Sequence, residues 1–465
     1  MDKFLRSARA RGGQSKIWWR KGLVFAGQLT LLTLLLGSLP ATAQILRPEV
    51  SEPFLSDPLL DEPRDPLLPT TPVSRPLSPL ERLALETGLD ELNQAALAAL
   101  QAGQEEVAFA LWIREVRLRR LLGVPQEIAA IQRVGGYAWE AGRTQEIQLL
   151  TAQLRRVRQQ VEAATPLDQR LLVEIATGFE ILGEPNDAIA LYRQLANLAV
   201  TAGNTVVYQA YLEKIAALES DWFQFAAAAT TYRELYQLVQ GQVAPLSAPY
   251  LQREIANLEQ AQQFEQATVV QQELLDLYQA GQVLEVVPEL QRATAQNFQT
   301  VGNLEAASRY YQAAYTNAIT LEQFEVASQV IDELALVYRT LGRLDDVLYL
   351  YQQRLLVNRQ VYDAYTIMEN FDQLGQLYEE LDQPTEAVAA FQEGLILAAH
   401  LGHRQNYFTE QIRRLAPESM ITPGESLAPV EGTSEPTSDQ PLPSTLPLEN
   451  SGPQNSGSPA DVWRQ

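Results

Sequence analysis

From residue 80 to residue 416, apolar side chains recur every three or four positions, the spacing of one face of an α-helix. Residues 174–195, EIATGFEILGEPNDAIALYRQL, show the smallest unit of this pattern. The small residues Ala176 and Ala188 each precede an aromatic residue by three or four positions, and a glycine and a proline lie between them. Glycine favours the end of a helix and proline the first turn of the next one. The pattern predicts two helices joined by a tight turn.

The same order of small residues returns about every 40 positions, which predicts eight units. The first small position is expected at Ala96, Gly136, Ala176, Ala216, Ala256, Ala295, Ala335 and Gly375. The second is expected at Ala108, Gln148, Ala188, Ala228, Ala267, Ala307, Val347 and Ala387. Both series contain one interval of 39, which predicts a one-residue deletion between Ala256 and Ala267.

Aromatic residues accompany both small positions at helical spacing, so we expect them to fill the space beside each helix crossing. Those following the first small position are Trp139, Phe179, Phe298, Tyr338 and Tyr378. Those following the second are Trp112, Tyr192, Tyr232, Tyr311, Tyr351 and Phe391. A single hairpin cannot cover its own apolar face, so the units are expected to stack.

The segment I-A-x-x-F-x-x-L-G-x-x-x-x-A-x-x-x-Y-x-x-L, residues 175–195, resembles the motif of the tetratricopeptide repeat (TPR) family. The resemblance covers residues 89 to about 416, with a period of 40 instead of 34. It implies an all-α fold, an α-solenoid of about eight helix-turn-helix (TPR-like) repeats. Residues 404–415 are amphipathic and precede a proline, which predicts a polar-backed capping helix at the end of the stack.

The first 43 residues have the form of a signal peptide. Seven basic side chains and one acidic side chain in residues 1–22 precede an apolar run that ends near Leu39. The small residues Ala41 and Ala43 then form an A-x-A cleavage site. We expect the segment to be removed; the alternative is a retained membrane anchor, for which the apolar run is short. The expected compartment is the periplasm, with the thylakoid lumen or the extracellular space as alternatives.

Two proline-rich segments flank the repeats, which gives the domain order 1–43, 44–80, 81–416 and 417–465. Residues 44–80 contain nine prolines and predict an extended linker. This linker contains Asp-Pro-Leu-Leu twice, at 57–60 and 65–68, as a short docking motif or as an incidental feature of a spacer. Residues 417–465 are acidic, rich in Pro, Ser and Thr, and predict a disordered tail.

Charge and composition exclude several classes of function. The net charge of −22 repels phosphate backbones, so nucleic acid is not an expected partner. No cysteine is present, which excludes disulfides, thiolate metal sites and a lipid-anchored cysteine. His400 and His403 lack a nearby third ligand, and no nucleophile or phosphate-binding motif occurs. We therefore expect no catalytic site, no metal and no cofactor.

The TPR resemblance implies a ligand groove lined by the first helix of each unit. Transferred to this chain, the groove positions carry many amide and arginine side chains, suited to the backbone of an extended peptide or to a sugar chain. The alternative at each position is a solvated helix face. The candidate groove residues are Asn93, Arg133, Tyr137, Val173, Thr177, Arg253, Asn257, Arg292, Gln296, Arg339, Asp372 and Gln376.

A basic region is predicted on the second helices of the first two units. It could receive an acidic partner, or its arginines could simply suit the C-terminal ends of the helices. The candidate basic patch is Arg114, Arg117, Arg119, Arg120, Arg155, Arg156 and Arg158. Together these features predict an exported, non-enzymatic protein-interaction scaffold or assembly factor that binds proteins or extended peptides; the alternative is a groove that binds a polysaccharide or peptidoglycan fragment.

Overall fold

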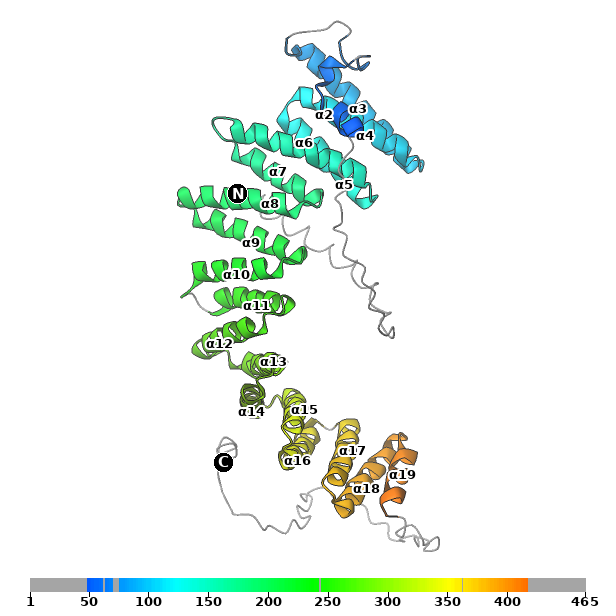
Figure 1. The fold of residues 1–465 in the computed structure, drawn as a ribbon, viewed down its shortest axis with the longest axis vertical. Helices are drawn as coiled ribbons and strands as arrows, with labels where there is room; N and C mark the ends of the chain where they lie inside the picture. The colour runs from blue at the N-terminus through cyan, green and yellow to red at the C-terminus, as the bar shows by residue number, and fades with distance from the viewer. Residues whose placement is uncertain (1–47, 62, 70–74, 242–243, 362, 417–465) are drawn as a thin grey trace, which may run out of the picture. The chain divides into compact units, whose positions relative to one another are not determined.

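The computed structural model describes residues 48–61, 63–69, 75–241, 244–361 and 363–416. The expected signal peptide and the expected disordered tail lie outside these residues. The described residues contain α-helices and three short 3-10 helices, and no strand (Figure 1). The predicted all-α class is therefore confirmed. No helix among the described residues is both long and apolar enough to cross a membrane.

Eight helix pairs follow one another along the chain, as the repeat predicts (Figure 1). The pairs are α3 (Pro79–Gln101) with α4 (Glu105–Arg119), α5 (Val124–Glu140) with α6 (Thr144–Ala163), α7 (Gln169–Ile181) with α8 (Pro185–Thr201), α9 (Thr205–Asp221) with α10 (Phe225–Val239), α11 (Ala244–Gln260) with α12 (Phe264–Ala280), α13 (Val287–Thr300) with α14 (Leu304–Thr320), α15 (Phe324–Thr340) with α16 (Leu344–Val361), and α17 (Ala364–Glu380) with α18 (Pro384–Leu401). Consecutive helices pack against each other throughout, which makes a solenoid of TPR-like repeats. The short helix α19 (Gln405–Leu415) packs on α18 through the buried side chains of Phe408 and Ile412.

A three-residue turn joins the two helices of every pair, and its middle residue adopts a left-handed backbone. In the first turn the amide of Gln104 donates to the carbonyl of Ala99 at 2.9 Å, which satisfies a carbonyl at the end of α3. Five of the eight left-handed positions are glycine, for which a positive φ carries no steric penalty. The eight positions are Gly103, Gly142, Gly183, Phe223, Gln262, Gly302, Gly342 and Asp382.

These turns correct the expected register of units two and five. The left-handed positions follow at intervals of 39, 41, 40, 39, 40, 40 and 40 residues. Counting back from the turns, the first small position falls at Gly135 and Ile255, not at Gly136 and Ala256. A Cβ atom on Gly135 would lie 2.7 Å from Leu182 Cδ2, whereas one on Gly136 would meet nothing within 4 Å. Those two expected positions are therefore wrong.

Two further expectations fail because of the same offset. In unit two, the amide of Ile147 donates to the carbonyl of Arg143, as that of Ala188 does to Glu184 in unit three, so Ile147 replaces Gln148 in the second small position. The deletion expected between Ala256 and Ala267 instead precedes Ile255. In unit two a shorter connection is followed by a longer one, so the two offsets cancel and are hard to see in the sequence.

Small and aromatic side chains pack in the core of most units as expected. Ala188 is fully buried beside the nearly buried Tyr192, and Tyr311 and Phe391 are fully buried in units six and eight. Trp139 is an exception, because the corrected register places the buried Ala138 in its column. Trp139 is instead 50% exposed at the end of α5.

The segment before the repeats contains more structure than its prolines predict. Residues Pro48–Leu55 form helix α2, and Pro58–Leu60 form the 3-10 helix η2. Proline is compatible with a first helical turn because the amide it lacks has no helical partner there. The second Asp-Pro-Leu-Leu contributes Leu68, which is buried against Leu85 and Leu118 of the first unit. Residues 57–69 are therefore packed on the stack and are not an extended spacer.

Candidate functional site

Candidate groove residues in the first two units contact one another and the second helices. The indole Nε1 of Trp112 donates to Asn93 Oδ1 at 3.0 Å, and Tyr137 stacks on the indole with ring centroids 4.7 Å apart. Arg133 pairs with the buried carboxylate of Glu115 at 2.7 Å. These contacts join α3, α4 and α5, so the side chains stabilise neighbouring helices.

In later units the candidate groove arginines pair with acids one unit further along. Arg292 and Gln296 both donate to Glu333 Oε1, at 2.6 and 2.8 Å. Arg339 pairs with Glu380 at 2.8 Å. The repeat brings these residues together because side chains about 40 positions apart lie on adjacent first helices.

The remaining groove candidates differ in exposure. Val173 is half-buried, and its carbonyl accepts a bond from Thr177 Oγ1 at 3.0 Å. Arg253 is exposed, whereas Asn257 is buried and donates to the Arg253 carbonyl. At the C-terminal end, buried Asp372 accepts bonds from Gln376, Arg404 and Tyr407, which fasten α19 to α17.

The candidate basic patch is largely neutralised within the chain. Arg114 pairs with Asp65 at 2.7 Å and Arg117 pairs with Asp61, so the acids of residues 57–69 meet the basic side chains of α4. The other pairs are Arg119 with Glu115 and Asp90, Arg120 with Glu127, Arg155 with Glu184 and Asp187, and Arg158 with Glu162 and Asp187. Arg156 is exposed on α6. The structure thus places an acidic segment of the same chain on part of this patch.

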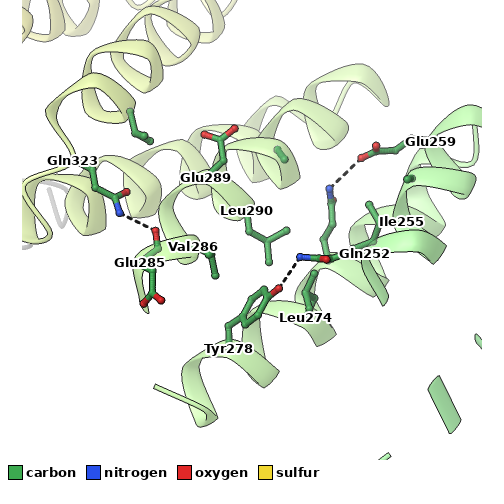
Figure 2. Close-up of a pocket in the computed structure, with 14 residues that line it drawn as sticks. Gln252, Ile255, Glu259, Leu274, Tyr278, Glu285, Val286, Glu289, Leu290 and Gln323 are labelled. Carbon is green, nitrogen blue, oxygen red and sulfur yellow. Dashed lines mark hydrogen bonds between the residues drawn. The ribbon is translucent and has the colours of Figure 1, made fainter. Parts of the chain in front are cut away.

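A pocket that the groove positions do not include lies in units five to seven. Its volume is about 570 Å³, and its walls come from α11, α12, α13, the 3-10 helix η4 (Leu284–Val286) and the start of α15 (Figure 2). The apolar walls are Ile255, Leu274, Val286, Leu290, Val326 and the ring of Tyr278. Ala256 and Ala293 leave room because their side chains end at Cβ. A pocket of this size accommodates a small molecule or a large side chain of a partner.

The polar groups around the pocket are acidic or neutral. The lining contains the carboxylates of Glu259, Glu285 and Glu289, and no lysine or arginine. Asn297 donates to Glu259 at 2.7 Å, and Arg292 donates to Glu289 at 2.9 Å. No donor to the carboxylate of Glu285 is found among the described residues, although its backbone carbonyl accepts from Gln323, as Figure 2 shows. Glu285 is therefore the carboxylate left available for a cation.

Hydrogen bonding holds the inner wall of the pocket in place. Gln252 Nε2 donates to the hydroxyl of Tyr278 at 2.7 Å, which joins α11 to α12 (Figure 2). Burial raises the pKa of Tyr278 and opposes the donated bond, so the hydroxyl stays neutral. The wall thus presents a neutral aromatic ring, with charge confined to the carboxylates.

Sequence reasoning missed this pocket because it assigned Ala256 to the helix-packing column. With the register corrected, Ile255 takes that column and Ala256 becomes exposed beside the pocket. A sequence signal was present: the three carboxylates occur in residues 259–289 with no basic residue between them.

The described residues show no chemistry of another kind. No group of three His, Cys, Asp or Glu side chains among them is arranged to hold a metal ion. His400 Nδ1 lies 2.8 Å from the carbonyl of Ile396, and the His403 ring lies near Tyr365. The two histidines thus have separate neighbours.

Comparisons with known proteins give structural likenesses only. No protein-family model matches the chain, and no curated protein matches it. BtubC from P. vanneervenii is similar at 16% identity, over 54% of this chain and 97% of that one, with a TM-score of 0.32. Aspartyl phosphate phosphatase F from Bacillus subtilis is 13% identical over 63% and 80%, also at 0.32, and a Podosopora anserina kinesin light chain with TPR-like repeats is 14% identical over 50% and 95%, at 0.22. The assignment therefore rests on the helix pairs themselves: the chain is an all-α stack of TPR-like repeats.

Proposed function

We propose that this chain is an exported, non-enzymatic interaction scaffold that binds an extended segment of a partner protein. The pocket between α11, α12 and α13 is the observation that carries the proposal. It accepts an apolar side chain of the partner, and the carboxylate of Glu285 attracts a lysine or arginine next to that side chain in the partner sequence.

Two physical arguments support this partner chemistry. Interfaces gain most of their affinity from a few large side chains that fill desolvated pockets, and this pocket offers apolar walls of that kind. A cluster of carboxylates without basic neighbours creates a negative potential, which favours a cationic segment and repels an acidic one. An apolar residue beside a basic residue satisfies both conditions.

The test compares two alanine-to-tryptophan variants by in-cell crosslinking and mass spectrometry of the recovered partners. The Ala256→Trp side chain would fill the pocket, and we expect it to lower recovery of the main partner by about tenfold, since a buried anchor contributes on the order of 2 kcal/mol. Ala217 is the matched control, because it is exposed at the same position of unit four. Equal recovery with Ala256→Trp and Ala217→Trp would contradict the pocket as the binding site.

A second variant tests the charge. Reversing the carboxylate with Glu285→Arg should slow association, and the effect should shrink as salt is raised, because exposed charges are screened over about 8 Å at physiological ionic strength. Association measured by surface plasmon resonance at low and high salt reports this directly.

Export is a separate part of the proposal, supported by the charge and hydropathy pattern of residues 1–43. N-terminal sequencing of the protein from fractionated cells tests it. Mature chains beginning at Gln44 in the exported fraction are expected; full-length chains in the cytosol would refute export.

A further inference from the structure

Four aromatic residues gather at the turns of units two to four, on a part of the stack that the proposed function does not use. Trp139 ends α5 and lies 6.1 Å from Trp222, centroid to centroid, with the rings inclined by 64°. Trp222 is followed by Phe223, which packs edge-to-face on Phe225 at 5.8 Å. We name Trp139, Trp222, Phe223 and Phe225 the aromatic edge. Trp139, Trp222 and Phe223 are 50%, 37% and 68% exposed, whereas tryptophan and phenylalanine normally bury most of their surface.

Gly183 allows Trp139 to reach Trp222. These two tryptophans belong to units two and four, and the turn of unit three lies between them. A Cβ atom on Gly183 would stand 2.2 Å from Trp139 Cζ3, so a side chain there would displace the indole. The glycine also has a φ of +71°, but any turn of this type meets that requirement. Only this turn must also leave space for a tryptophan from the preceding unit.

Phe223 is exposed at a backbone position that disfavours it. It occupies the left-handed position of its turn with a φ of 60°, where five of the other seven units have glycine. A bulky residue is rare in this conformation because its Cβ crowds the backbone. Exposure of the ring returns no burial energy to offset that cost. Strain retained without a structural gain is typical of a residue kept for binding.

The surroundings of the aromatic edge indicate what it binds. Leu182 of the intervening turn is buried, so the exposed apolar surface of these turns is aromatic. The exposed carboxylates of Glu140 and Asp221 adjoin Trp139 and Trp222 in the chain, and Gln224 donates to Asn186 between neighbouring turns at 2.9 Å. Carboxylates and amides are acceptors for hydroxyl groups, and these acids repel anionic lipids and anionic polymers.

We infer that the aromatic edge is a binding site for an uncharged polysaccharide chain. The C–H groups of a pyranose ring carry partial positive charge and pack against the negative face of an aromatic ring. Its hydroxyls donate to the neighbouring carboxylates. The site lies at the turns and not in the groove, so it is separate from the peptide pocket, and a scaffold with both would hold its protein partner beside a glycan.

The experiment measures mobility of the full chain in native gels containing hydroxyethylcellulose, laminarin or dextran, with tryptophan emission as a second readout. We expect retardation by at least one of the three. Trp222→Ala and Trp139→Ala should each weaken the apparent affinity by about tenfold, the scale of one aromatic contact. Tyr365→Ala removes an aromatic ring that is also exposed but lies far along the chain, and it should leave retardation unchanged.

Phe223→Gly separates binding from folding. Glycine relieves the left-handed backbone, so the melting temperature should stay equal or rise while retardation falls. A variant that merely damaged the fold would lower both. Ala256→Trp should leave glycan retardation intact, so failure of the peptide pocket and failure of the aromatic edge are told apart.

Three results would overturn the inference. One is no retardation by any of the three polysaccharides. Another is retardation that persists in Trp222→Ala and Trp139→Ala. The third is dependence on these tryptophans for binding to phosphatidylcholine vesicles or for self-association in sedimentation velocity, without glycan binding, which would assign the aromatic edge to a lipid surface or to a second copy of the chain.

Discussion

Units one and two and units five and six both place charged side chains beside apolar surface, but the chain covers only the first of these regions. On α4, Arg114 and Arg117 meet Asp65 and Asp61, while Leu68 is buried beneath them. At the pocket, Glu285 has no donor to its carboxylate among the described residues, and Leu274 borders open volume.

The comparison shows how one repeat serves two purposes. Where an acidic, leucine-bearing segment of the chain lies on basic helices, charge and apolar area are satisfied internally. Where no such segment lies, the same helix pairs leave a site for another molecule. The covered region also shows the chemistry that a ligand of the uncovered region needs, with the charges reversed.

The largest expected effect comes from Trp112→Ala in the covered region. The indole is fully buried, bonded to Asn93 and stacked on Tyr137. Its loss should cost about 3–5 kcal/mol of local stability through the cavity and the unpaired amide. Hydrogen exchange should speed up in α3 to α6 and remain unchanged in α11 to α13, because each repeat is coupled mainly to its neighbours.

Leu274→Ala is the matched variant in the uncovered region. Leu274 is buried but lines the pocket, so its removal enlarges existing space and should cost about 2 kcal/mol, the low end for such substitutions. Equal costs for Leu274→Ala and Trp112→Ala would show that the pocket is not a preformed space.

Leu68→Ala should release the covering segment at a cost of about 2–3 kcal/mol, since Leu68 is buried in the cluster with Leu85 and Leu118. Limited proteolysis should then cut residues 57–69 faster, while the repeats keep their protection. An unchanged cleavage rate would mean that the ion pairs of Asp61 and Asp65 hold the segment without the leucine.

The two regions should respond to pH in opposite directions. Burial would raise the pKa of Asp65, but hydrogen bonds from Arg114 and the Leu67 amide hold that pKa below its ordinary value of 3.8. Its stabilising contribution is complete above pH 3.8 and is lost as the pH falls below that value. The covering segment should therefore loosen in acid.

Glu254 of α11 behaves in the reverse sense. Burial raises its pKa to about 7 despite the bond from Arg233 Nε at 2.9 Å, and Glu273 shares the same arginine. Between pH 4.5 and 7 the folded chain keeps a proton that the unfolded chain has lost, so stability falls as the pH rises through this window. Hydrogen exchange of α10 to α12 should be faster at pH 8 than at pH 5. Glu254→Gln should flatten this difference and leave the acid response of residues 57–69 unchanged; a persistent slope would place its origin elsewhere.

The repeat itself could be predicted from the sequence, because small and aromatic residues at fixed spacing report directly on helix crossings. The eight pairs and their turns follow from that pattern. The pocket could not be predicted, since it depends on whether Ile255 or Ala256 enters the crossing, and only the turns decide this register. The partners of Arg114 and Arg117 were equally hidden, because Asp65 and Asp61 lie about 50 residues away in a proline-rich segment.

The smallest effect tests that register at the pair Gly135 and Gly136 in unit two. Gly136→Ala adds a methyl group in open space within a helix, so it should raise stability by about 0.5–1 kcal/mol. Gly135→Ala gains the same helix propensity, but its methyl group would lie 2.7 Å from Leu182 Cδ2, and Leu182 is itself buried. Overpacking costs about 1–3 kcal/mol, so the net change should be destabilising. Urea unfolding of the two variants should therefore give opposite signs. The reverse order would restore Gly136 to the crossing and, since unit five has the same one-residue offset, would weaken the case that Ala256 faces the pocket.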